Sequence, residues 1–427
     1  MNRAIPIAII CCQRPHYLQK TLLGLAESCN NSENSFNVRL FQDMPSGDRE
    51  ESIGITSQCA QYFHQTFPNG SIDIADKNIG IAANFKRAEA WAFSDMDGSS
   101  KYDAAFFFEE DFVPNESTIP WLIAMLNSEN KDSNRIGAVS AAGHIQSCRE
   151  NILTPMGQLW AYGIKKYAYK KISNKIEEYD RLAIEAFEQH GLHHPAQDIC
   201  LGLAVKWGYE PQASSRDSFL TMALHSEGFL QIAPNGVHGE YIGVTGVNTC
   251  EEQFNASEWR KHANDFSIPI QEAIKKELPR LAPTIKDHQE KQFRTLDPTF
   301  YSDACAIAYE QRRYANCLKI AERGLELLGT QTCRGYPFCF ERHRIKGLVG
   351  IKAIDDAINY CNEMAKKNSG SWPFWALARS LEDTKRIDLA DRTWQFIIQT
   401  YEDKNGAATN AYKRFIERIQ KAVDPHK

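Results

Sequence analysis

Three consecutive carboxylates, Glu109, Glu110 and Asp111, come directly after the apolar run 102–108. Carboxylates this close together repel one another unless a cation lies between them, and hard oxygen ligands suit Mg²⁺ or Mn²⁺. The alternative is a solvated loop in which these side chains only end a buried strand. The triplet therefore marks a candidate site for a divalent metal, with a plain strand end as the competing interpretation.

Polar side chains also follow the three apolar runs that precede the triplet. Arg14 comes after the first run, Asp43 after the second and Asp76 after the third. In an open parallel sheet ligands bind outside the carboxyl ends of the strands, so these side chains should converge on one crevice. An arginine there can hold a phosphate that shares the metal. Each residue taken singly is better explained as a turn residue, but their recurrence at strand ends predicts a metal–diphosphate site.

The elements that must position these residues fall into two regions. Up to about residue 265, short apolar runs alternate with amphipathic stretches, the pattern of a mostly parallel sheet covered by helices. The predicted strands are 5–12, 37–43, 71–76, 102–108 and 135–143. Beyond that point helical periodicity takes over, with a spacing of roughly 35–40 residues that resembles tetratricopeptide-like repeats. The predicted helices are 314–328, 353–367, 372–384, 387–402 and 408–422.

We therefore expect an α/β domain over 1–265, a connector over 266–300 and an all-α, tetratricopeptide-like domain over 301–427. An irregular helical bundle is the alternative for the last part. The chain has 427 residues and a net charge of −5, which gives no general attraction to nucleic acid or to anionic membranes. Its 12 cysteines show no paired zinc spacing, and no apolar run is long enough to span a bilayer. A cytoplasmic setting with reduced thiols is the expectation.

Four segments together resemble the nucleotide-sugar half of GT-A fold glycosyltransferases. They are "IPIAIICCQRP", "RLFQD", "DKNIGIAANFKRA" and "FFFEEDFVPN", in this order, and they look most like the N-acetylglucosaminyltransferase I group and its bacterial inverting relatives. The resemblance implies that Asp111 binds the metal of the donor diphosphate and that Glu110 lies near the donor sugar or its ribose. It places Arg14 near the diphosphate and Asp43 near the uridine.

The same resemblance assigns further contacts. Asp76, Lys77 and Asn78 correspond to positions that contact the nucleotide or place the neighbouring loop. The segment "HHPAQDICLGLAVKWGYEP" resembles the acid–helix–Gly-Tyr segment of inverting members, which makes Asp198 the catalytic base. A first-turn helix position for Asp198 would lower its basicity, so helix capping is the competing role.

Two aromatic or imidazole side chains complete the candidate set. Trp160 lies in a segment that similar enzymes use as the floor of the sugar site, where a ring can stack on a sugar; a core position explains it equally well. His238 lies where many members of the fold place a metal-ligating histidine, with a hydrogen-bonded loop histidine as the alternative.

The expected function is transfer of a sugar from a nucleotide-diphosphate donor, first of all a UDP-sugar, to a glycan or glycoconjugate hydroxyl. Mn²⁺ or Mg²⁺ would be the cofactor, and the reaction would proceed with inversion. The helical domain would bind a partner, self-associate or present the acceptor. Two other classes stay open: a sugar nucleotidyltransferase, which would normally have a Gly-rich phosphate loop that "CCQRPHYLQK" lacks, and a non-catalytic scaffold acting through the helices.

Overall fold

The chain divides into two compact units. One comprises residues 1–195 and 213–294, and the other residues 196–212 and 295–427. The computed structural model describes residues 4–94, 103–127, 135–143, 153–155, 158–191, 197–207, 216–234, 237–244, 286–287, 298–333, 336–368, 370–401 and 406–423. Within the segment 196–212, the described residues 197–207 thus group with the C-terminal helices, although they precede the last strands of the first unit.

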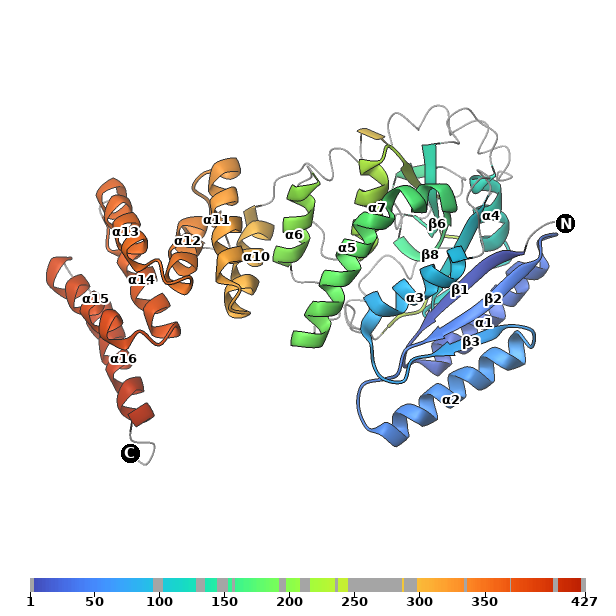
Figure 1. The fold of residues 1–427 in the computed structure, drawn as a ribbon, viewed down its shortest axis with the longest axis horizontal. Coiled ribbons are helices and arrows are strands. Elements are labelled where there is room, and N and C mark those ends of the chain that lie inside the picture. The colour runs from blue at the N-terminus through green and yellow to red at the C-terminus, as the bar shows by residue number, and fades with distance from the viewer. Residues whose placement is uncertain are drawn as a thin grey trace. The chain divides into compact units, whose positions relative to one another are not determined.

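The first unit is built on an eight-stranded mixed sheet (Figure 1). Its strand order is β3-β2-β1-β4-β8-β6-β9-β7. The strands are β1 (Ile5–Cys11), β2 (Phe36–Gln42), β3 (Ser71–Ile74), β4 (Ala104–Glu109), β6 (Ile136–Ala142), β7 (Leu153–Pro155), β8 (Gln158–Lys165) and β9 (Leu230–Pro234). β1 to β4 run parallel to one another, whereas β8 is antiparallel to both of its neighbours, β4 and β6. A separate antiparallel pair is formed by β5 (Phe112–Pro114) and β10 (Gly239–Tyr241).

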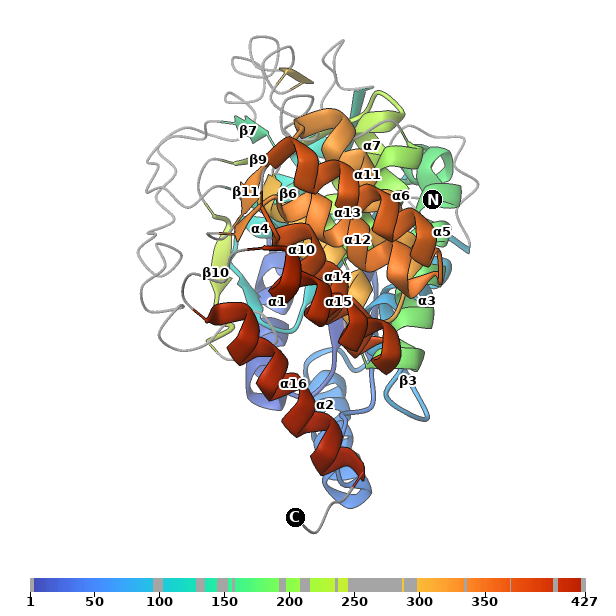
Figure 2. The same ribbon diagram turned by 90° about the vertical axis from the view of Figure 1, so that its left-hand side faces the viewer.

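Two layers of helices cover this sheet (Figures 1 and 2). One layer packs α1 (Pro15–Asn30) against both α2 (Arg49–Thr66) and α4 (Thr118–Leu126), and the other packs α5 (Lys166–His190) against both α3 (Gly80–Ser94) and α7 (Arg216–Ser226). Strands β1 and β4 are apolar and buried because both of their faces are covered, as central parallel strands require. The five predicted strands are thus confirmed, each within two residues at either end.

Glycine at position 24 lets α1 approach β5, the short strand that follows the acidic triplet. A Cβ atom there would collide with the carbonyl oxygen of Pro114 and lie 3.1 Å from Val113 Cγ1. Because a backbone oxygen cannot move aside, we expect Gly24→Ala to lower the free energy of unfolding by about 1–3 kcal/mol. The control is Gly54→Ala in α2, where a Cβ meets nothing within 4 Å, so it should raise stability by up to ~1 kcal/mol. Urea denaturation compares the two variants, and equal effects would contradict this packing.

The second unit consists of helices. They are α6 (Gln197–Lys206), α10 (Pro298–Glu310), α11 (Tyr314–Leu328), α12 (Cys339–Gly350), α13 (Ile354–Asn368), α14 (Trp372–Asp383), α15 (Ile387–Thr400) and α16 (Ala407–Val423), with a small hairpin of β11 (Thr332–Cys333) and β12 (Tyr336–Pro337). α10 packs on α6 and α11, and each later helix packs on a neighbour in the chain. The main core of this unit is lined by α12 to α16.

Three turns of the second unit repeat the same backbone geometry. Arg312, Lys352 and Lys385 all have positive φ, and each lies two residues before a helix, namely α11, α13 and α15. The residue after each of them donates its N–H to a carbonyl five residues earlier, at 2.8, 3.0 and 2.8 Å. Equivalent turns after α10, α12 and α14 make these helices a series of helix–turn–helix pairs. The tetratricopeptide assignment itself stays a prediction.

The fold class expected from the sequence is therefore confirmed: a mostly parallel α/β unit is followed by an all-α region. Two strands depart from the parallel arrangement: β8, which lies antiparallel between β4 and β6, and β7, which is antiparallel to β9. Among the described residues, no helix is long and apolar enough to cross a membrane.

Candidate active site

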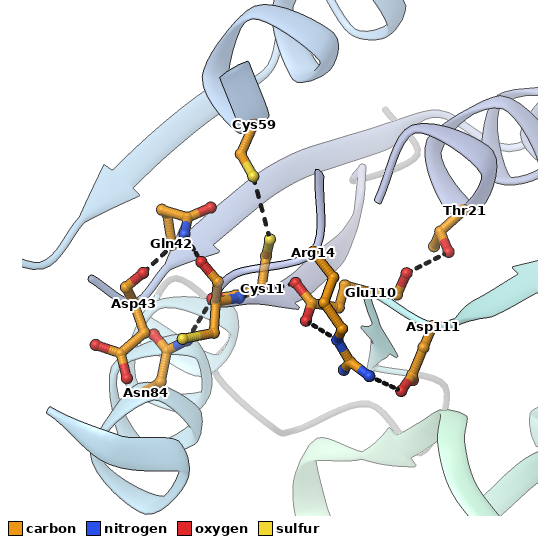
Figure 3. Close-up of polar contacts among 10 residues, drawn as sticks. Cys11, Arg14, Thr21, Gln42, Asp43, Cys59, Asn84, Glu110 and Asp111 are labelled. Carbon is orange, nitrogen blue, oxygen red and sulfur yellow. Dashed lines mark hydrogen bonds and ion pairs between the residues drawn. The ribbon is translucent and has the colours of Figure 1, made fainter. Parts of the chain in front are cut away.

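Arg14 lies between two of the predicted carboxylates, at the carboxyl ends of β1 and β4 (Figure 3). Its Nε donates to Glu110 Oε1 at 2.6 Å, and its Nη1 lies 2.8 Å from Asp111 Oδ2. The two strands are parallel neighbours with Ile10 opposite Glu109, so the residues that follow them meet at one edge of the sheet. Burial opposes the charge of the guanidinium, but the two carboxylates outweigh it and raise the pKa of Arg14. The sequence prediction that these three residues converge is met.

Glu110 has partners on every oxygen. Its Oε2 accepts the backbone N–H of Cys12 at 2.9 Å, and its backbone carbonyl accepts the hydroxyl of Thr21 at 2.8 Å. Together with the Arg14 contact, these bonds tie the β1–α1 turn to the end of β4. Glu110 is 3% exposed, so its carboxylate acts first as an anchor for that turn. Its predicted contact with the donor sugar or ribose stays a prediction.

Asp111 keeps one carboxylate oxygen without a partner. Oδ2 faces Arg14, whereas Oδ1 is buried and accepts no hydrogen bond in the described structure. Burial raises the pKa of Asp111, and the neighbouring guanidinium counteracts that effect. The backbone carbonyl of Asp111 accepts the N–H of Ile242 at 2.8 Å, which brings the segment after β10 alongside it. A side chain in place of Gly243 would put its Cβ 2.7 Å from Asp111 Oδ2, so only a glycine fits beside this carboxylate without a clash.

These features fit a divalent cation. A buried carboxylate oxygen that lacks a donor is a hard ligand of the type that Mg²⁺ and Mn²⁺ prefer. Among the described residues, however, no three His, Cys, Asp or Glu side chains come together as a ligand set. A cation held here by Asp111 would therefore complete its shell with oxygens of a bound phosphate and with water, as Mg²⁺ commonly does.

Asp43 occupies the end of β2 and caps α3. Its Oδ1 and Oδ2 accept the N–H groups of Ile79 and Gly80 at 2.9 and 3.0 Å, where negative charge stabilises the helix start. Asn78 donates its side-chain amide to the carbonyl of Met44 at 2.6 Å. The carboxylate is only 4% exposed, and burial raises its pKa despite these donors. Its predicted uridine contact stays a prediction, and the structure assigns it a capping role in addition.

Asp76 and Lys77 lie beside Asn78 in the exposed loop between β3 and α3. Their side chains are accessible to a ligand, in contrast to Asp43. Asn78 is half-buried by its bond to the loop after β2. The structure thus brings the two predicted nucleotide segments, 43–44 and 76–80, into direct contact.

Trp160 packs against Tyr241 close to the acidic triplet. Their ring centroids are 4.0 Å apart with an interplanar angle of 15°. Trp160 precedes Ala161, which pairs with Phe108 in β4, so its ring stands next to the carboxyl end of that strand. Tyr241 is close enough to Arg14 to contribute to its raised pKa. Trp160 is partly exposed, which leaves its role as a sugar platform a prediction with a suitable location.

His238 is buried away from this edge. Its ring stacks on Trp121 at 4.7 Å, its Nδ1 is 2.7 Å from Ser117 Oγ, and burial lowers its pKa to about 3. In the β5–β10 ladder, Ile242 contacts Asp111, whereas His238 lies at the opposite end, next to Gly239. At about 3.4 Å per residue, the four-residue separation puts the two well beyond a shared metal. The arrangement does not support His238 as a metal ligand.

Asp198 begins a helix of the other unit. It is in the first turn of α6, which packs with α10 and α11, and its side chain lies outside the described residues. The predicted helix after Pro195 is present. Asp198 is assigned to the second unit, whereas Arg14 and Asp111 belong to the first, and its role as base stays a prediction.

A carboxylate that sequence reasoning missed is Asp217, in the first turn of α7. It accepts the N–H of Leu159, the neighbour of Trp160, and it helps to raise the pKa of Glu109, whose first cause is burial. Burial also raises the pKa of Asp217 itself. The signal was available, because "RDSFLTMALHSEGF" repeats the acid–helix–Gly-aromatic pattern seen around Asp198. Only the packing shows which copy belongs to the unit that carries Asp111.

The residue before Asp217 fixes the start of α7. Arg216 Nη2 is 2.6 Å from Glu89 Oε1 of α3, and its Nε is 3.3 Å from Asp180 Oδ1 of α5. Tyr169 donates its hydroxyl to the other oxygen of Glu89 at 2.9 Å. All three charged side chains are at most 5% exposed. This buried network holds three helices together and thereby sets the position of Asp217.

No protein-family model matches this sequence, and no curated protein sequence does. Among solved structures, the chain is similar to a mannosyltransferase, PcManGT from Pyrobaculum calidifontis, solved in complex with GDP-Man and Mn²⁺, with 14% identity, a TM-score of 0.36 and coverage of 75% of this chain and 79% of that one. It is also similar to S. aureus TarS 1–349, with 12% identity, a TM-score of 0.39 and coverage of 86% and 92%. A TarS structure in complex with UDP-GlcNAc has a TM-score of 0.35 at 13% identity. All three TM-scores are too low to support a functional inference, which therefore rests on the residues of the site.

Proposed function

We propose that the chain is a metal-dependent glycosyltransferase that uses a nucleotide-diphosphate sugar, with a UDP-sugar as the first candidate. The observation that carries this proposal concerns the two oxygens of the Asp111 carboxylate. Oδ1 is buried and accepts no hydrogen bond in the described structure, and Oδ2 contacts the Arg14 guanidinium. A free carboxylate oxygen is a ligand for a divalent cation, and a guanidinium is a hydrogen-bond donor for a diphosphate. Their place at the carboxyl ends of central parallel strands is where this class of sheet binds ligands.

The residues of the first unit suggest a division of roles. Asp111 would hold the cation, which when bound neutralises charge on the leaving diphosphate. Arg14 would bind the diphosphate oxygens, and the loop with Asp76 and Lys77 would face the nucleotide. Trp160 would offer its partly exposed ring to a sugar.

For the proton of the acceptor hydroxyl, we propose Asp217 as the general base. It is an acid of the same unit whose charge acts on Glu109 of the triplet, and burial raises its pKa toward the range in which a carboxylate accepts a proton well. A base that acts opposite the leaving diphosphate gives inversion. Asp198 remains the competing candidate, and the two are separated by experiment below.

The function is tested by donor turnover. The full chain is incubated with Mn²⁺ and a panel that includes UDP-GlcNAc, UDP-glucose and GDP-mannose, and release of nucleoside diphosphate and of pyrophosphate is measured. We expect slow, Mn²⁺-dependent release of a nucleoside diphosphate from one donor, lost in Asp111→Asn. In a parallel incubation with a nucleoside triphosphate and a sugar phosphate, release of pyrophosphate would instead identify a nucleotidyltransferase. Absence of both reactions would favour the scaffold.

A further inference from the structure

We propose that Arg14 takes the place of the donor's cation at Asp111 and changes partner when the donor binds, so that cation and diphosphate bind cooperatively. The inference rests on the proposed function and assigns Arg14 a second role in it. In the free protein Arg14 would compete with the cation for the Asp111 carboxylate, and in the complex it would bind the diphosphate.

The two carboxylates that pair with Arg14 differ in their other hydrogen bonds. Glu110 holds Nε at 2.6 Å, and its other oxygen is already bound to the N–H of Cys12. Asp111 holds Nη1 through Oδ2 at 2.8 Å, and its other oxygen has no donor. Both carboxylate oxygens of Glu110 therefore have a donor, whereas only one oxygen of Asp111 does. The second pair is the one that can exchange.

Accessibility points the same way. Both carboxylates are nearly buried, with side chains 4% and 5% exposed, whereas the Arg14 side chain is 21% exposed. Figure 3 shows the guanidinium spanning the two acids, with the Asp111 contact at its far end. A guanidinium has several donors in a fixed fork, so Nε can stay on Glu110 while the terminal nitrogens turn to a phosphate. Glu110 would thus serve as the pivot.

The exchange has a thermodynamic consequence. A cation that binds Asp111 alone must displace Nη1, so the partly buried guanidinium loses one of its two carboxylate contacts, which is unfavourable. When a diphosphate is present, the same nitrogen gains a new anionic partner. Each ligand therefore removes an obstacle to the other, and this reciprocity is the definition of positive coupling between two sites.

The test measures Mn²⁺ affinity by the electron paramagnetic resonance signal of free Mn²⁺, with the full chain alone and with saturating UDP or GDP. For the wild-type protein we expect the effective nucleotide to tighten Mn²⁺ binding by a factor of roughly 5–150, the usual range of such coupling. Arg14→Met should bind Mn²⁺ alone several-fold tighter than wild type, because the competing cation is gone. Its tightening by nucleotide should be several-fold smaller than in wild type, because only the coupling through phosphate oxygens bound to the cation remains.

Arg39→Met is the matched control. Arg39 pairs with Asp73 at 3.5 Å and has a similar exposure of 28%, but it lies in the middle of β2, opposite Ala8 of β1, and not at the carboxyl end of a strand. This variant should keep the wild-type values. Circular dichroism checks folding; if Arg14→Met fails to fold, Arg14→Lys replaces it. A lysine keeps the charge without the fork, so its Mn²⁺ affinity alone should stay near wild type while the nucleotide coupling drops.

The outcomes separate this inference from the proposed function. If Mn²⁺ and a nucleotide bind with full coupling in the folded Arg14 variant, the exchange is wrong and the glycosyltransferase proposal stands. If Arg14→Met binds Mn²⁺ alone no more tightly than wild type, Arg14 does not compete for Asp111 and the inference is likewise overturned. If neither nucleotide binds wild type with Mn²⁺, the proposed function fails, and the inference fails with it.

Discussion

Arg216→Met is expected to lower the free energy of unfolding by about 3–5 kcal/mol, because it leaves two carboxylates buried without their cation. Glu89 and Asp180 are 3% and 2% exposed in their side chains and have Arg216 between them at 2.6 and 3.3 Å. Burial already raises the pKa of both acids, and Arg216 is the main group that counteracts it. Urea denaturation, followed by near-ultraviolet circular dichroism, measures the change.

The effect should depend on pH in a defined direction. An acid whose pKa is raised in the folded state binds more protons there, so it weakens folding above its unfolded pKa of about 4 and has no effect well below that value. Without Arg216 the pKa of both acids is raised further, and their ionisation weakens folding more. The loss of stability in the variant should therefore grow as the pH rises from 4 to 8. A triple variant, Glu89→Gln, Asp180→Asn and Arg216→Met, should recover part of the loss because no charge stays buried.

The control for this network is Arg181→Met on the same helix as Asp180. Arg181 pairs with Glu185 at 2.8 Å, but both side chains are about half exposed. Solvent screens such pairs, so the change should be below about 1 kcal/mol. Equal losses in Arg216→Met and Arg181→Met would show that the buried network contributes nothing beyond an ordinary surface pair.

Asp217→Asn is expected to reduce sugar transfer by a factor of roughly 10²–10⁴ while donor binding stays within about twofold of wild type. The amide has nearly the same shape and can still accept the Leu159 N–H, but it does not take up a proton. Asp198→Asn should retain most of the activity if Asp217 is the base. Both variants are compared in donor hydrolysis and transfer assays with binding measured separately.

The opposite pattern would reassign the base. If Asp198→Asn abolishes transfer and spares donor binding, whereas Asp217→Asn stays active, the original sequence interpretation is right and α6 must contribute to catalysis. If both variants lose donor binding together with activity, neither residue is a specific base. A third possibility, full activity in both, would exclude general-base catalysis by either carboxylate.

The parts of the fold that sequence patterns predicted well are those with one dominant signal. The runs "IPIAIICC" and "AAFFF" are apolar throughout because strands β1 and β4 are covered on both faces, so their positions followed directly. The antiparallel strand β8 gave no comparable signal, since direction within a sheet depends on the connection and not on composition. Its insertion between β4 and β6 had to come from the structure.

In the site, too, some residues could be predicted from the sequence and others could not. The meeting of Arg14 with Glu110 and Asp111 followed from strand ends, because parallel neighbours share an edge. The burial of His238 against Trp121 depends on the β5–β10 pair, which local sequence does not reveal. Two copies of one acid–helix pattern, at Asp198 and Asp217, were indistinguishable by sequence, and only long-range packing assigns them to different units.

The central claim is that Asp111 couples a divalent cation to a nucleotide-sugar. Isothermal titration of the active donor from the turnover panel, with and without Mn²⁺, into wild type and Asp111→Asn tests it most directly. Asp73→Asn, which alters a carboxylate paired with Arg39 and Arg87 elsewhere, is the control. We predict Mn²⁺-dependent binding in wild type and in the control, and its loss in Asp111→Asn. Mn²⁺-dependent binding that is unchanged in Asp111→Asn would contradict the account.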